Sequence, residues 1–195
     1  SLDTATQRLY TLGIDGELRC WNTERAGEPV WRRNLYDEFR AGRRPSVDGG
    51  RRDYGLPSSP LLSGNWVIVE VGAKEGHLLA FAKDTGEPAW SSDSGIPAGH
   101  TAGPVPVKVA DTPCLATLAL RGLVVARADP GHEGQTVATF PWATHFACNI
   151  PSPAVTPRGV LITSGYNHRR MVHLALEPEG ARELWSTRQH AVVGT

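Results

Sequence analysis

The chain has 195 residues, and its 20 Lys and Arg balance its 20 Asp and Glu, so its formal net charge at pH 7 is zero. This length suits one ordinary domain. The charge balance argues against a general nucleic-acid binder, because such domains usually carry a basic excess. No apolar run approaches the ~20 residues of a membrane helix, and the start of the chain shows no signal-peptide pattern.

Turn-forming and aromatic residues are frequent, with 21 Gly, 15 Pro and six Trp against a single Met. This composition favours an all-β fold. The three cysteines, Cys20, Cys114 and Cys148, form no C-x-x-C pair, so neither a zinc ribbon nor a thioredoxin-type motif is supported. We expect them to be small buried hydrophobes on strands, and the sequence leaves their redox state open.

An internal repeat is the strongest feature of the sequence. Residues 8–21 and 67–81 each contain an alternating apolar run, a turn ending in Gly16 or Gly76, and a second alternating run. Such turns are typical of β-hairpins because glycine tolerates positive φ. Each unit then passes through a further glycine turn to a tryptophan, Trp31 or Trp90. Two more units, with more drift, follow in the second half of the chain.

The period of the repeat predicts a β-propeller of four-stranded antiparallel blades, with about four blades present. Trp90 and Trp185 lie two units apart, which gives a period of about 47 residues, within the range of propeller blades. The expected units span residues 1–36, 55–95, 100–143 and 149–188, with an inserted loop at 36–57 and the start of a further strand at 189–195. Trp31, Trp90 and Trp185 are expected to pack between neighbouring blades.

One stretch carries a family resemblance. Residues 76–90 read Gly-x-Leu-x-Ala-Phe-x-x-x-Thr-Gly-Glu-x-x-Trp, which resembles the repeat of the PQQ-like (pyrroloquinoline-quinone-like) β-propeller family. Residues 58–68, 140–142 and 162–166 are also similar to bacterial PQQ-binding-like repeat proteins, relatives of the propeller lipoprotein of the outer-membrane β-barrel assembly machinery. The resemblance spans essentially the whole chain, although the third and fourth units lack the Thr-Gly-Glu-x-x-Trp motif. It is more specific for fold than for function.

The resemblance implies a ring of seven or eight blades, so we expect this chain to form part of one. Two alternatives remain open at this stage. Two copies of the chain can pair to complete a ring, or residues 191–195 can supply a missing outer strand of the first unit and close a ring of four.

Candidate binding residues lie in loops, which carry function in propellers while the strands form the scaffold. The inserted loop contains Arg43, Arg44, Arg51 and Arg52, and such a group can hold a carboxylate or phosphate of a partner. Residues at the same inter-blade position would converge on one end of the channel if the blades are related by rotation. They are Tyr54, His100, His145, Asn149 and His190. A basic hairpin loop adds Tyr166 and His168. We expect no metal site and no catalytic residue among them.

These observations predict a non-catalytic scaffold that binds a protein or peptide partner through inter-blade loops or blade edges. The signatures H-E-x-x-H, G-x-S-x-G and G-x-G-x-x-G do not occur in the sequence. The resemblance implies one alternative, part of a quinoprotein dehydrogenase that binds PQQ with calcium. Members with that activity use a catalytic Asp and often adjacent cysteines, and we match neither here. A purely structural part of a longer chain also stays open. The resemblance further implies an extracytoplasmic location in bacteria.

Overall fold

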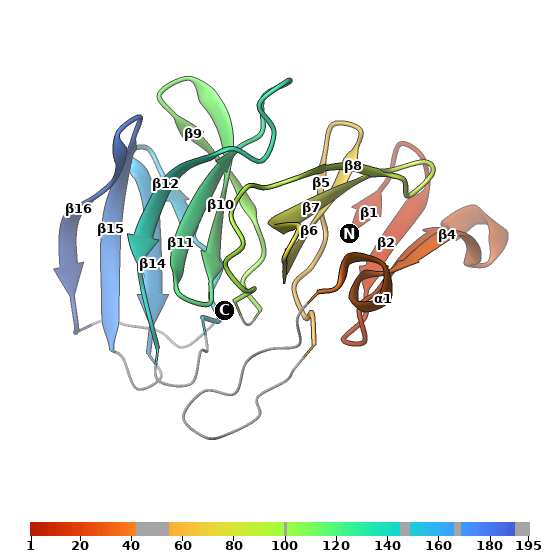
Figure 1. Ribbon diagram of the computed structural model, residues 1–195, viewed down its shortest axis with the longest axis horizontal. Helices are drawn as coiled ribbons and strands as arrows, with labels where there is room; N and C mark the ends of the chain where they lie inside the picture. Colours follow the sequence, from red (N-terminus) through yellow and green to blue (C-terminus); the bar gives the residue numbers. More distant parts are fainter. Residues whose placement is uncertain (42–54, 100, 145–148, 166–168, 190–195) are drawn as a thin grey trace.

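The computed structural model describes residues 1–41, 55–99, 101–144, 149–165 and 169–189. Its strands form four antiparallel sheets of four strands each, and every sheet is built from consecutive strands of the chain. We call these sheets blades 1 to 4. They stand side by side in chain order, from red to blue in Figure 1. This arrangement confirms the predicted all-β propeller class with four blades.

The strand bounds follow the repeat. Blade 1 contains β1 (Leu2–Asp3), β2 (Arg8–Leu12), β3 (Glu17–Asn22) and β4 (Glu28–Asn34). Blade 2 contains β5 (Leu61–Ser63), β6 (Trp66–Ala73), β7 (Gly76–Ala82) and β8 (Pro88–Ser91). Blade 3 contains β9 (Val105–Val109), β10 (Thr112–Ala119), β11 (Gly122–Arg127) and β12 (Thr136–Pro141). Blade 4 contains β13 (Ala154–Thr156), β14 (Gly159–Ser164), β15 (Arg170–Glu177) and β16 (Gly180–Thr187).

The two ends of the blades differ in what connects the strands. At one end, uppermost in Figure 1, turns join the first strand to the second and the third to the fourth. We call this the turn end. At the other end, turns join the second strand to the third, and the connections between blades begin and finish there. We call this the loop end. Antiparallel pairing in strict chain order dictates this division.

A β-bulge at the same register of every blade makes the four units directly comparable. The pairing of the third with the fourth strand shifts after Cys20, Ala80, Val125 and His173. Opposite these residues stand Trp31, Trp90, Ala138 and Trp185. Blade 3 therefore carries alanine where the others carry tryptophan, which explains why its motif is weak in the sequence.

The core lies between the blades, and two of the three tryptophans lie there as predicted. Trp31 packs against Tyr10 and donates from Nε1 to the carbonyl oxygen of Lys83 in blade 2, at 2.7 Å. Trp90 packs against the cluster that contains Leu115 of blade 3. The prediction is wrong for Trp185, which is 45% exposed, because blade 4 is the last blade in the described part of the chain.

The described residues also bear on the inserted loop, of which residues 42–54 lie outside the described part, and on the cysteines. The loop predicted at 36–57 begins with a short helix, α1 (Leu35–Phe39), which Asn34 caps and whose Phe39 ring meets Phe81 edge-on at 5.3 Å. Cys20 and Cys114 are free and buried on strands, as predicted, whereas Cys148 lies outside the described residues.

Blade 1 has all four strands, so no strand is missing for residues 191–195 to supply. The alternative in which residues 191–195 supply a missing strand of the first unit is therefore wrong. Residues 190–195 themselves lie outside the described part of the chain. A short 3₁₀ turn, Thr23–Arg25, and α1 are the helical segments of the described chain, and neither has the length or apolar character to cross a bilayer.

Candidate functional site

Ten of the eleven candidate residues from the sequence lie outside the described residues, and their roles stay predictions. They are Arg43, Arg44, Arg51, Arg52, Tyr54, His100, His145, Tyr166, His168 and His190. The described strands that precede these segments end at the loop end.

Asn149, the remaining candidate, is fully buried at the loop end. Its amide nitrogen donates to the carbonyl oxygens of Ala119 and Leu120, at 2.5 and 3.3 Å, at the β10–β11 turn. Its amide oxygen accepts from the hydroxyl of Thr144 at 3.4 Å. These bonds fasten the connection between blades 3 and 4 to blade 3. The structure therefore gives this side chain an internal role, with no surface for a partner to contact.

Blade 2 has a second polar contact of this kind, which sequence reasoning missed. Glu70 on β6 and His77 on β7 are 1% and 0% exposed, and Glu70 Oε1 lies 3.3 Å from His77 Nε2. The same oxygen accepts from the backbone N–H of Gly99 at 2.7 Å, and His77 Nδ1 lies 2.8 Å from the carbonyl oxygen of Ile96. The pair thus fastens the connection between blades 2 and 3. A glutamate inside the apolar run 67–71 was the available signal.

Burial controls the protonation of this pair. A carbonyl oxygen only accepts hydrogen bonds, so His77 Nδ1 carries a hydrogen toward Ile96. Desolvation lowers the pKa of His77 to about 4, while the bond to Ile96 opposes that shift. The imidazole is consequently neutral near pH 7.

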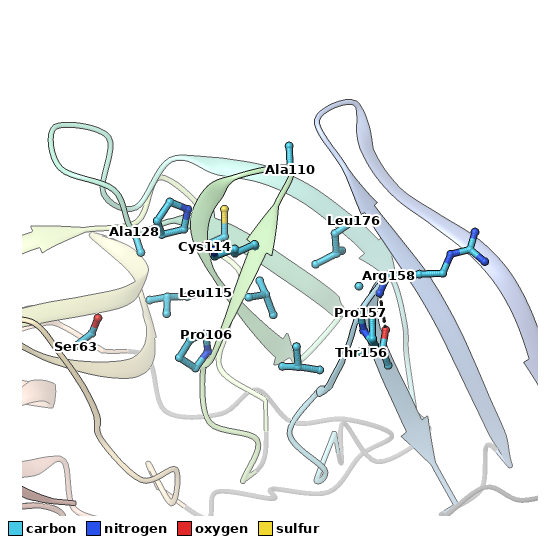
Figure 2. A pocket seen from close by; sticks show the side chains of 15 residues that line it. Ser63, Pro106, Ala110, Cys114, Leu115, Ala128, Thr156, Pro157, Arg158 and Leu176 are labelled. Atoms are coloured by element: carbon cyan, nitrogen blue, oxygen red, sulfur yellow. Dashed lines mark hydrogen bonds between the residues drawn. The ribbon is translucent and has the colours of Figure 1, made fainter.

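A cleft at the turn end has a volume of about 720 Å³. It lies beside the first strands of blades 2, 3 and 4 and separates the β9–β10 hairpin from the β13–β14 turn (Figure 2). Its floor is buried and apolar, and includes Leu115 and Leu176, which are 1% and 8% exposed. Three prolines, Pro106, Pro113 and Pro157, contribute rigid apolar walls.

Local backbone geometry shapes both walls of the cleft. Ala110 adopts a left-handed conformation, with φ of 52°, to make the tight β9–β10 turn. On the opposite wall, the Thr156 hydroxyl accepts from the Arg158 N–H at 3.3 Å and lies 2.9 Å from His173 Nε2. Gly159 follows with φ of 145°, where a Cβ atom would lie 2.1 Å from the carbonyl oxygen of Leu174. A side chain there would displace the β13–β14 turn.

The charges of the cleft have one sign. Lys108 and Arg158 line it, and none of the described lining residues is acidic. Lys108 lies exposed on β9, whereas the Arg158 side chain reaches away from the other lining residues (Figure 2). Cys114 also lines the cleft, but it is 2% exposed and desolvation raises the pKa of its thiol, so it is a poor nucleophile. The cleft can therefore hold an apolar group that carries a negative charge.

The described residues do not fit a quinone held with calcium. Calcium takes six to eight oxygen ligands, many of them carboxylates. In the described ranges, no three His, Cys, Asp or Glu gather closely enough to hold a metal ion. The cleft also has no aromatic side chain among its described lining residues, so it offers no ring on which a quinone stacks. We assign no quinone chemistry to this site.

Comparison with known proteins places the fold in a family. The family model described as outer membrane protein assembly factor BamB matches residues 3–195. The chain belongs to this family. The BamB family assignment confirms the resemblance to PQQ-like propeller repeats, now over nearly the whole sequence.

A solved structure of BamB supports the fold. The crystal structure of BamB from Moraxella catarrhalis superposes with a TM-score of 0.54 at 15% identity, covering 96% of this chain and 49% of that chain. A structure of PorZ, a surface component of the type-IX secretion system of Porphyromonas gingivalis, gives a TM-score of 0.49 at 13% identity, covering 94% of this chain and 21% of that one. No curated protein matches significantly. The chain thus spans about half the length of the BamB structure.

Proposed function

We propose that this chain is a non-catalytic propeller scaffold that holds an extended segment of a protein partner in the turn-end cleft. The proposal rests on the composition of this cleft. It combines an apolar floor with rigid proline walls, and both of its charged lining residues are cationic. We therefore expect the bound segment to insert apolar side chains and to place a carboxylate near Lys108.

Side-chain insertion fits this cleft better than addition of a strand to its edge. Pro106 lies inside β9 and Pro157 directly follows β13. Proline has no backbone N–H, so these inner strands offer fewer donors to an added strand. The outer strands β4, β8 and β12 also contain proline, whereas β16 does not. Addition of a partner strand to a blade edge is thus the less favourable binding mode, except at β16.

Family membership supports the class of partner and the location. A family described as an outer membrane protein assembly factor handles other proteins, which favours a protein ligand over a small substrate. The same description favours an extracytoplasmic location in the cell envelope, where the chain would meet such partners. Enzymatic chemistry receives no support from the described cleft, which lacks an acid–base pair.

A peptide-binding experiment tests the proposal. The probes are short labelled peptides of alternating apolar and polar residues, in one version with an acidic end and one with a basic end. We expect fluorescence anisotropy to show tighter binding of the acidic version. Val155 lines the cleft on β13 and is 56% exposed. Replacing it by aspartate, Val155→Asp, places a negative charge in the cleft and should weaken binding at least about tenfold.

Ile14→Asp is the matched control. Ile14 is 70% exposed and lies in the β2–β3 turn at the loop end, so its substitution should leave binding unchanged. The proposal is wrong if neither peptide version binds, or if Val155→Asp binds as tightly as the unmodified chain.

A further inference from the structure

Acidic residues are distributed unevenly over blades 3 and 4. Six Asp and Glu occur in residues 94–195, and five of them lie in or directly beside turns at the turn end, namely Asp111, Asp129, Glu133, Glu177 and Glu179. The sixth, Glu183, lies within β16. The segments 120–121, 142–153 and 165–169, which connect strands at the loop end, contain no Asp or Glu.

Arginines, by contrast, gather at the loop end of the same two blades. Arg121 lies in the β10–β11 turn, Arg169 directly precedes β15, Arg170 begins β15, and Arg188 directly follows β16. Arg121, Arg169 and Arg188 are exposed. Within the described ranges, their guanidinium groups take part in no ion pair and no hydrogen bond.

Trp142 links the arginines of blade 3 to those of blade 4. It directly follows β12 and is 2% exposed. Its backbone N–H donates to the carbonyl oxygen of Arg121 at 3.0 Å, and its ring centre lies 5.5 Å from the guanidinium of Arg170. One buried residue therefore brings together a cation from each of two neighbouring blades.

The strand register of blade 4 adds the other two arginines. β15 and β16 pair Met171 with Thr187, so Arg170 and Arg188, one residue farther toward the loop end, are neighbours across the two strands. Arg169 precedes Arg170 in the chain. We call these four residues, Arg121, Arg169, Arg170 and Arg188, the arginine patch. It lies at the junction of two described blades, at the lower left of Figure 1.

The arginine patch has an excess of positive charge. A carboxylate oxygen of Glu183 lies 2.6 Å from the guanidinium of Arg170, which compensates one of the four cations. The other three have no described counter-charge. Like charges on neighbouring strands repel and lower stability. An anion bound among them thus gains contacts and also removes a repulsion that the free chain carries.

We propose that the arginine patch binds a short acidic segment of a protein partner. The planar guanidinium matches a carboxylate with two parallel hydrogen bonds. The size of the patch favours this partner over polyphosphates and anionic membranes, which are bound by larger basic sets, often of about four to eight Lys and Arg. The zero net charge of the chain favours it too. The patch and the turn-end cleft lie at opposite ends of the blades, so each can bind independently of the other.

Fluorescence anisotropy with labelled hexaglutamate tests the proposal, because this probe has no apolar side chain to insert into the cleft. We expect binding at low ionic strength that weakens as salt rises from about 0.05 M to about 0.5 M, and no binding of hexalysine. The double variant Arg121→Gln, Arg188→Gln should bind hexaglutamate about tenfold more weakly or less. Arg25→Gln is the matched control. Arg25 is exposed at the turn end of blade 1, so its loss should leave binding unchanged.

The two binding surfaces can fail separately. Val155→Asp should keep hexaglutamate while losing the apolar peptide, and the double arginine variant should do the reverse. Circular dichroism melts should show that the double variant is at least as stable as the parent chain, because a repulsion is reduced. Absence of hexaglutamate binding overturns the proposal, as does a folded double variant that binds it as tightly as the parent. Tighter binding of a thymidine hexanucleotide, or of phosphatidylglycerol vesicles, also overturns the acidic protein segment as the partner.

Discussion

The two ends of the blades use polar side chains in opposite ways. At the loop end, Glu70, His77 and Asn149 are at most 1% exposed. Glu70 and His77 bind the backbone of the connection between blades 2 and 3, and Asn149 binds the backbone of the β10–β11 turn. At the turn end, Lys108 lies exposed beside an apolar cleft.

Substitutions at the two ends are therefore expected to affect the stability of the fold differently. A buried polar group that loses its partner has no water to replace it, so its removal destabilises the fold. Replacing an exposed lysine leaves no buried polar group without a hydrogen-bond partner. We therefore expect substitutions of buried polar residues at the loop end to lower stability, and substitutions at the turn end to weaken partner binding.

Glu70→Ala should show the largest loss of stability. It leaves the buried Gly99 N–H without its acceptor and opens a cavity beside His77 Nε2, and an unsatisfied buried group together with such a cavity costs about 3–5 kcal/mol. Urea denaturation followed by circular dichroism measures the effect. Glu75→Ala is the matched control, because Glu75 is exposed in the adjacent β6–β7 turn. Equal midpoints for the two variants would contradict a structural role for Glu70.

Asn149→Ala should rank second. The change removes both donors to the carbonyl oxygens of Ala119 and Leu120, and we expect a loss of about 3 kcal/mol because two buried acceptors lose their bonds. Hydrogen exchange should rise first in the β10–β11 turn. Asn65→Ala, in the exposed β5–β6 turn, should change neither quantity. A rise in hydrogen exchange spread evenly over blade 3 would contradict a local role of Asn149 in holding the β10–β11 turn.

The sequence predicted the blades well and the polar contacts at the loop end poorly, for a physical reason. Alternating apolar runs and glycine turns are local, so residues 8–21 and 67–81 reveal their hairpins directly. The bulge opposite Trp31, Trp90, Ala138 and Trp185 depends on pairing between strands, and Ala138 leaves the predicted third unit without a closing tryptophan. Trp185 was misplaced because its environment depends on what covers blade 4.

The candidate site shows the same limit. Asn149 was chosen for its place in an inter-blade loop, and nothing local in the sequence indicates that its amide turns inward to Ala119. The cleft was missed because its lining residues come from three blades, including Ser63, Pro106 and Thr156. Apart from Lys108 and Arg158, they are apolar or small residues without a motif. Contacts between distant segments, which the repeat does not encode, determine both features.

The pH dependence of stability sharpens the comparison at the loop end. Burial holds the pKa of His77 near 4, while an unfolded histidine titrates near 6.5. The unfolded chain therefore binds more protons between these values, and stability falls as pH falls through this window. By pH 5 this loss amounts to about 2 kcal/mol. His77→Gln should lack that part of the dependence. Parallel curves for both proteins would instead mean that folding leaves the pKa of His77 unchanged.

Lys108→Ala should have the smallest effect on stability and a clear effect on binding. Lys108 is exposed on β9, and the change should stay within about 0.5 kcal/mol in urea denaturation. Lys74→Ala, exposed in the β6–β7 turn at the loop end, should match it. The acidic peptide, however, should lose its advantage over the basic one with Lys108→Ala, because the exposed cation that attracts a carboxylate is gone. Persistence of that advantage would show that the charge of the cleft does not select the partner. A loss of stability as large as that of Asn149→Ala would show that the two ends do not divide stability from binding.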